Sequence, residues 1–373
     1  MKLFQYLSTF FSSKPKERGQ SQPKQRERLG ASNVDYYRAK KSVHFPFDFD
    51  RWYPRLKEYT FPSTILPITP QTARAMVHFY QQKFLDREEL TLEDIEQLQE
   101  LERILLHAME VYESGVFPRM SNRSPKDGLP LLEDSETLLS KYKTALESSD
   151  DPNEKLIKLS ELQMKSLHCQ TPQQVMNLLL TSERIYTDLI LALACLRDNP
   201  DDEWSTSIIL REWQPTLREQ NEFRLFVYQG KVTAISQYNH TCLYPSLTAN
   251  EHNQEVLNAL NDRLTEFAKK AHPEIGMKDY ILDLAVVDDQ IRIVELNPFA
   301  ESTGGCLFSW RADHDLLHGN LESLRPCLRV RMEKRPDIKD LVEVVVEEQE
   351  TVESHNNSPY YELLHEKTAA RPG

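Results

Sequence analysis

The sequence predicts an α+β protein in which antiparallel hairpins and amphipathic helices alternate. Two stretches have the residue pattern of hairpins: "NEFRLFVYQGKVTAISQYN", turning at 229–231, and "DYILDLAVVDDQIRIVELNPF", turning at 288–290. A long helix begins after Thr91, where Asp94 completes a capping box. After about residue 202 the predicted strands alternate with helices, so the sequence also leaves an α/β arrangement open.

The other elements follow from periodicity and capping signals. We expect the helix after Thr91 to end at Gly115, because glycine favours the left-handed C-cap conformation. Another helix opens at Thr171, and "STSIILREW" is typical of a strand. The remaining predicted elements are a strand at 64–68, a helix at 71–84, a polar helical insert at about 129–160, and a helix at 250–271.

The chain divides into one domain and two tails. Residues 1–41 hold ten Lys/Arg against three Asp/Glu, so we expect a disordered basic tail of about +7. Residues 42–335 form the domain, including the insert at about 129–160. Residues 336–373 are acidic, and we expect most of them to be mobile.

Composition argues against several functional classes. The net charge of −13 argues against general nucleic-acid binding, and no stretch approaches the roughly 20 apolar residues that span a bilayer. The five cysteines are widely spaced without a CxxC pair, which indicates reduced thiols in the cytoplasm. There is no Walker A loop, Rossmann glycine fingerprint or GxSxG elbow.

Two carboxylates are candidates for a metal site in the second hairpin. If the turn has three residues, Asp283 faces Glu295, and Asn297 lies on the same strand face as Glu295. Like charges at facing positions are useful mainly when a cation lies between them, and hard oxygen ligands suit Mg²⁺ bridged to phosphates. A two- or four-residue turn would place the carboxylates on opposite faces. An exposed strand face with ordinary charges is the alternative interpretation.

Cationic residues accompany these carboxylates. Arg119 and Lys126 lie in or beside the loop-like stretch "VFPRMSNRSPKDG", while Arg211 and Arg224 interrupt apolar strands. An arginine in an apolar strand requires an anionic partner, either a carboxylate or a nucleotide phosphate. We predict that the four cations converge in one cleft.

The sequence resembles the cell division cycle protein 123 family over roughly residues 44–330. The matching stretches are "FDRWYP", "STILPI", "VFPRMSNRSPKD", "SLHCQTPQQVMNLLLTSERI", "ILREW", "EFRLFVYQGKVTAISQYN" and "DYILDLAVVDDQIRIVELNPFAESTGGCLFSW". The resemblance implies an ATP-grasp-like fold, whose two lobes, built of antiparallel sheets with flanking helices, hold ATP and Mg²⁺. It also implies an assembly chaperone that binds the gamma subunit of eukaryotic translation initiation factor 2 and promotes assembly of that factor.

The resemblance also implies roles for individual residues. Asp283, Glu295 and Asn297 match the family's magnesium ligands, although the family more often has aspartate at the position of Glu295. Arg119 stands where the family usually has a lysine that reaches phosphates, and Asn122 where it has tryptophan. The other implied nucleotide-binding residues are Ser124, Pro125, Lys126 and Asp127 in the loop, Arg211 and Trp213 at the adenine hinge, and Arg224 and Gln237 facing the phosphates.

These observations lead to one main functional expectation and two alternatives. We expect a cytoplasmic, monomeric, Mg-ATP-binding chaperone without catalytic residues, acting on the initiation factor without nucleic-acid or membrane partners. An ATP-grasp enzyme of the carboxylate-amine ligase type is one alternative, and a divergent family member acting on the initiation factor is the other. His168 with Cys169, and His314 with His318, are weaker candidates for chemistry.

Overall fold

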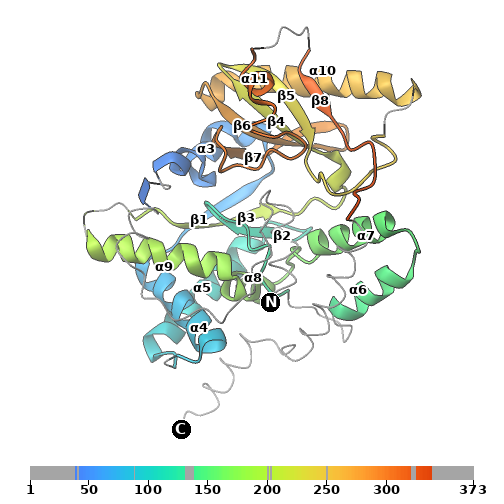
Figure 1. The fold of residues 1–373 in the computed structure, drawn as a ribbon. Helices are drawn as coiled ribbons and strands as arrows, with labels where there is room; N and C mark the ends of the chain where they lie inside the picture. Colours follow the sequence, from blue (N-terminus) through green and yellow to red (C-terminus); the bar gives the residue numbers. More distant parts are fainter. Residues whose placement is uncertain are drawn as a thin grey trace.

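The chain is organised as two lobes, each built on one β-sheet (Figure 1). The computed structural model describes residues 38–39, 42–87, 89–130, 138–199, 201, 204–248, 251–320 and 325–337. The first lobe has a three-stranded antiparallel sheet in the order β1-β3-β2. Its elements are β1 (Ser63–Pro67), β2 (Val116–Met120), β3 (Ser207–Glu212), α4 (Pro70–Leu85), α5 (Leu92–Met109), α8 (Pro172–Thr181) and α9 (Glu183–Asp198).

The second lobe has a five-stranded sheet in the order β7-β6-β4-β5-β8. All neighbours are antiparallel except β5 and β8. Its strands are β4 (Glu222–Tyr228), β5 (Lys231–Gln237), β6 (Tyr280–Val287), β7 (Gln290–Asn297) and β8 (Cys327–Arg329). Its helices are α3 (Phe49–Leu56), α10 (Glu251–Ile275) and α11 (His314–Leu317), with short 3₁₀ turns at Phe45–Phe47, Lys57–Tyr59 and Glu219–Asn221.

Each lobe has its own hydrophobic core. In the first lobe, one face of the small sheet packs on α4, α5, α8 and α9, with Ile208 and Leu210 fully buried. In the second lobe, one face of the large sheet packs on α3 and α10, with Leu225 and Leu282 fully buried. Ile209, on the opposite face of β3 from its two neighbours, belongs to the second core. The small sheet therefore lies between its helices and the large sheet (Figure 1).

The predicted elements are present, with one correction at the end of α5. Its start is confirmed, because the side chains and backbone of Thr91 and Asp94 form a reciprocal capping box. The helix ends at Met109, however, and Gly115 lies beyond it with φ +77°. A Cβ at Gly115 would lie 2.6 Å from the carbonyl oxygen of Cys169. Glycine is needed there for a close approach between two chain segments rather than as a helix cap.

The insert connects the two lobes. It contains α6 (Leu138–Glu147) and α7 (Pro152–Lys165), so its helical character is confirmed for the described part, whereas residues 131–137 lie outside it. Leu156 is buried in the second core, and the Asn153 amide exchanges hydrogen bonds of 2.8 and 2.9 Å with the Leu243 backbone. Since α7 leads directly into α8, it ties one lobe to the other.

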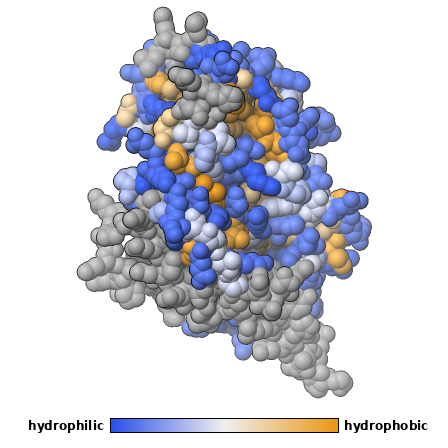
Figure 2. Space-filling view, turned by 90° about the vertical axis from the view of Figure 1, so that its right-hand side faces the viewer, coloured by the Kyte–Doolittle hydropathy of each residue, from blue (hydrophilic) through white to orange (hydrophobic). Residues whose placement is uncertain are grey.

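The outer surface of the described residues carries few large apolar side chains. Figure 2 shows one face on which hydrophobic residues lie in separate areas among hydrophilic ones. No helix in the described part of the chain has the length and apolar character to cross a membrane. The predicted tails, 1–41 and 336–373, lie almost wholly outside the described residues.

Candidate functional site

The turn of the second hairpin differs from the prediction, yet the carboxylates still face each other. Val287 pairs with Gln290, so the turn has two residues, Asp288 and Asp289, both with left-handed φ (49° and 62°). The three-residue turn was wrong. That register alone would separate the two carboxylates.

A β-bulge restores the pairing. Leu284 pairs with Ile293, but the next residue, Asp283, pairs with Glu295, so Val294 is the additional residue on β7. The bulge shifts β7 by one residue and turns the Glu295 side chain to the sheet face that carries Asp283. Asn297 follows two residues later on the same face.

Asp283 is held by a buried arginine from the neighbouring strand. Arg224 on β4 donates from Nε and Nη2 to the two oxygens of Asp283 at 2.8 and 2.7 Å. Its Nη1 donates to the Gly304 carbonyl oxygen at 2.6 Å, and Asn297 Nδ2 donates to Asp283 at 3.1 Å. Burial alone would lower the pKa of Arg224, but the Asp283 carboxylate raises it well above its usual value. Burial raises the pKa of Asp283, and the paired Arg224 guanidinium opposes that rise.

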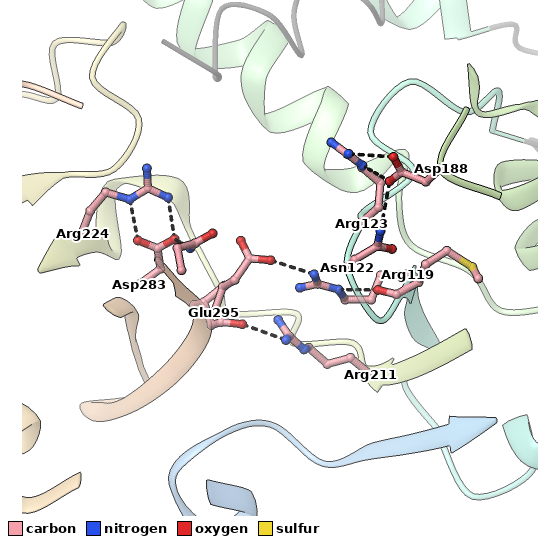
Figure 3. A network of polar contacts seen from close by, with 11 residues as sticks. Arg119, Asn122, Arg123, Asp188, Arg211, Arg224, Asp283 and Glu295 are labelled. Atoms are coloured by element: carbon pink, nitrogen blue, oxygen red, sulfur yellow. Dashed lines mark hydrogen bonds and ion pairs between the residues drawn. The ribbon is translucent and has the colours of Figure 1, made fainter. Parts of the chain in front are cut away.

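Glu295 is held by an arginine from the other sheet. Arg119 on β2 is 4% exposed, and its Nη2 lies 2.7 Å from Glu295 Oε1 (Figure 3). Burial alone would raise the pKa of Glu295, but Arg119 lowers it to about 2. No described residue donates a hydrogen bond to the other Glu295 oxygen. That oxygen is available to a ligand.

Arg211 makes a second contact between the sheets. From β3, its Nη2 donates to the Val294 carbonyl oxygen at 2.8 Å, at the bulge itself. Its Nε is buried without a hydrogen-bond partner among the described residues. Burial, followed by the nearby charge of Arg119, lowers the pKa of Arg211 to about 9. A buried guanidinium with an unused donor is a position where an anion would be stabilised.

Lys126 lies near the same carboxylates but is not paired with one. Its Nζ is 5.8 Å from the centre of the Tyr238 ring, and no carboxylate of the described residues lies within 4 Å of it. Burial lowers its pKa, and so does Arg184, while Glu222 and Glu295 act in the opposite direction. Arg119, Arg211 and Arg224 thus contact residues of β6 or β7, and Lys126 lies over the same Tyr238 ring as Arg224. Their role in binding a ligand stays a prediction.

The loop that carries Lys126 is fixed to the start of α9. Asp127 accepts hydrogen bonds from Ser182 Oγ at 2.6 Å and from the backbone N–H of Arg184 at 3.0 Å. Arg123 forms a bidentate pair with Asp188 on α9 at 2.6 and 3.0 Å (Figure 3). Asp127 thus holds the loop rather than pointing its carboxylate at the carboxylate–arginine network.

Four other residues expected to bind the nucleotide lie in the loop or make contacts within the protein. Ser124 is half-buried and Pro125 is buried in the loop, where the Pro125 carbonyl accepts from Gly128 N–H at 2.9 Å. The Trp213 ring stacks on His168 with 4.6 Å between ring centres. Gln237 is fully buried, and its amide hydrogen-bonds to the backbone of Asn239, Cys242 and Arg331. The described contacts therefore use Gln237 to hold the end of β5, and none of them directs it to a phosphate.

Two acidic residues near the site were not among the predicted site residues. Glu222 lies two residues before Arg224, so it shares the strand face of Arg224. Glu219 accepts hydrogen bonds from Ser160, Asn239 and Tyr244, and burial raises its pKa. The two-residue spacing could have identified Glu222. Glu219 could not be found this way, because it lies in a 3₁₀ turn and depends on α7.

Asp283, Glu295 and Asn297 carry the kind of oxygen donors that a magnesium ion bridged to phosphate takes. In the described part of the chain, no group of three or more His, Cys, Asp and Glu side chains is placed to hold a metal ion. Asp283 and Glu295 therefore need further oxygen ligands, which Asn297 and a bound phosphate would supply. The unused donor of Arg211 and the unpaired Lys126 match the phosphate's charge.

Comparisons with known proteins give a consistent result. The D123 family model matches residues 161–369. The translation initiation factor eIF2 assembly proteins of Schizosaccharomyces pombe and Xenopus tropicalis are 25% and 24% identical to this chain. The matches cover 76% and 73% of this chain and 81% and 78% of the relatives.

A solved structure supports the fold. The structure of Cdc123 from Schizosaccharomyces pombe matches with a TM-score of 0.51 at 19% identity, covering 78% of this chain and 96% of the other. The predicted α+β fold with two lobes is confirmed by this likeness together with the two-sheet architecture, while its ATP-grasp-like character stays a prediction.

A pH-dependent stability is expected from Glu222. Burial, followed by the charge of Glu219, raises the pKa of Glu222 to about 8. The folded chain then keeps a proton that the unfolded chain releases near pH 4.3, so this group lowers the stability as pH rises from about 4.3 to about 8. Glu222→Gln should raise the free energy of unfolding at pH 8 by about 1–3 kcal/mol and have little effect at pH 4. Urea unfolding at pH 4–8 measures this.

A matched control is Glu255→Gln on the exposed surface of α10. It should change the free energy of unfolding by less than about 0.5 kcal/mol at every pH. Equal effects of the two substitutions at pH 8 would show that Glu222 is not perturbed by its surroundings.

Proposed function

The chain belongs to the D123 family, and from this premise we propose that it binds Mg-ATP and assists the assembly of eIF2 by binding the gamma subunit. The curated relatives bear the name of eIF2 assembly proteins, which supports the assembly role. In this proposal the protein acts in the cytoplasm as a monomer. Its five cysteines are free thiols, which is in keeping with a reducing compartment.

One observation carries the nucleotide part of the proposal: two carboxylates on β6 and β7 face cations that come from both sheets. Asp283, Glu295 and Asn297 would hold Mg²⁺, while Arg119, Arg211 and Lys126 would neutralise phosphate oxygens. When bound, Mg²⁺ would screen the charge of the phosphates from the two carboxylates. The buried Arg119 and the other cations would orient the phosphate chain.

The same geometry favours binding over turnover. Two histidines are unsuited to act as a general base: His168 stacks on Trp213 and contacts the Ser114 carbonyl oxygen, and burial lowers the pKa of His240 to about 4. Neither is placed as a general base whose pKa lies near neutral pH. A nucleotide that contacts both sheets would stabilise one arrangement of the lobes, and that arrangement would present the surface for the gamma subunit.

The nucleotide part is tested by Glu295→Gln. The substitution keeps the size of the side chain but removes the charge that faces the metal, so the affinity for Mg-ATP should fall at least tenfold, about 1.4 kcal/mol. Asp288→Asn is the matched control, because it makes the same change at the exposed tip of the same hairpin, where asparagine tolerates left-handed φ. Calorimetric titration of Mg-ATP into the parent protein and both folded variants measures these affinities. Equal affinities for the parent and Glu295→Gln would refute the metal site.

The partner is tested by capture of purified eIF2 gamma subunit. We expect the immobilised protein to retain the subunit, more strongly with Mg-ATP than without nucleotide, and to release phosphate slowly or not at all. The Glu295→Gln variant should lose the nucleotide-dependent part of the capture. Absence of capture together with rapid phosphate release on a small carboxylate substrate would favour the ligase alternative instead.

A further inference from the structure

Arg184 is a cation at the site that forms no close ion pair with a described residue, although the charges of Asp127, Asp188 and Glu295 act on it from a distance. It is the second residue of α9, and its backbone N–H is bound by Asp127. Its guanidinium has no carboxylate within 4 Å and no hydrogen-bond partner among the described residues, although it is half-buried. A half-buried arginine without a counter-ion is unfavourable unless an anion reaches it.

The acids nearest in the fold are already occupied. Both oxygens of Asp127 accept hydrogen bonds, one from Ser182 and one from the Arg184 backbone. Asp188 lies one helical turn after Arg184, on the same face of α9, but both of its oxygens are taken by Arg123. The loop and helix are therefore locked together by two carboxylates that leave the Arg184 side chain unpaired.

Lys126, the residue before Asp127, is also half-buried and has no ion pair, because no carboxylate of the described residues lies within 4 Å of it. Burial lowers the pKa of Lys126, and the next largest contribution comes from the charge of Arg184, so the two cations repel one another. Arg123, which binds Asp188 one turn after Arg184, lies beside Arg119 (Figure 3), so the loop and the start of α9 are on the side of the network where Arg119 lies.

We propose that Arg184 and Lys126 form a two-cation subsite for the phosphate chain of the nucleotide, beside the Arg119–Glu295 pair. The proposal rests on the proposed function and adds Arg184 to the binding residues. Asp127 acts as the positioning residue, because it binds the Arg184 backbone and is adjacent to Lys126 in the chain. A bound phosphate would relieve the repulsion between the two cations and supply the missing counter-charge.

The test is Arg184→Gln, a change that leaves the backbone hydrogen bond to Asp127 intact. We expect the affinity for Mg-ATP and for inorganic tripolyphosphate to fall about tenfold or more, because one charge-assisted contact to the phosphates is lost. Arg184→Lys should recover part of the loss. Binding of both ligands should also become less dependent on salt, because one ionic contact is gone.

Arg197→Gln is the matched control. Arg197 lies near the far end of the same helix, exposed and paired with its neighbour Asp198, so its substitution should not change either affinity. Unchanged binding of ATP and tripolyphosphate by Arg184→Gln would overturn the subsite while leaving the proposed function intact.

The two proposals can fail separately. If the parent protein binds tripolyphosphate in an Arg184-dependent way but does not bind Mg-ATP, the subsite stands and the proposed nucleotide function fails. If the parent protein binds neither ligand, both are overturned.

Discussion

The salt bridge between Arg119 and Glu295 is the interaction on which the arrangement of the two lobes depends. Arg119 belongs to the small sheet and is almost completely buried, so it needs an anionic partner. Glu295 belongs to the large sheet and faces a second carboxylate, so it needs a cation. The small sheet supplies the cation of this ion pair and the large sheet supplies the anion. Removing one partner would leave a buried charge uncompensated, at a cost of about 3–5 kcal/mol.

The surrounding contacts extend this link into a site. Arg211 reaches the bulge on β7 from the same sheet as Arg119, and α7 packs against the second lobe on the way to α8. Lys126 and Arg184 add positive charge, and neither forms an ion pair with a described carboxylate within 4 Å. In our account Mg²⁺ and phosphates enter this network together, because the metal satisfies the carboxylates while the phosphates satisfy the cations. Nucleotide binding would then fix the relation of the lobes and, through it, the partner surface.

The sequence predicted much of this site because strand periodicity and charge carry strong signals. Asp283, Glu295 and Asn297 were identified from their spacing, and Arg211 and Arg224 from their position in apolar strands. The pairing of Asp283 with Glu295 was correct for a different reason, since a two-residue turn and a bulge together give the register expected from a three-residue turn. A bulge depends on packing between strands and has no local sequence signal as clear as a turn glycine.

Other features depend on contacts between distant segments. Gly115 has the residue type of a helix cap, but its role is set by the approach of Cys169. Asp127 has the residue type of a phosphate-loop residue, but it anchors the start of α9. Arg184 lies in an ordinary amphipathic helix, and only the fold shows that the acids near it are engaged elsewhere.

The most direct test is a crystal structure of the protein with Mg²⁺ and a non-hydrolysable ATP analogue. The account predicts the metal between Glu295, Asp283 and Asn297, with the phosphates against Arg119, Arg211, Lys126 and Arg184. It would be contradicted by a nucleotide bound elsewhere, for example in the surface pocket lined by Tyr59, Phe267 and Arg292, with the Arg119–Glu295 pair unchanged.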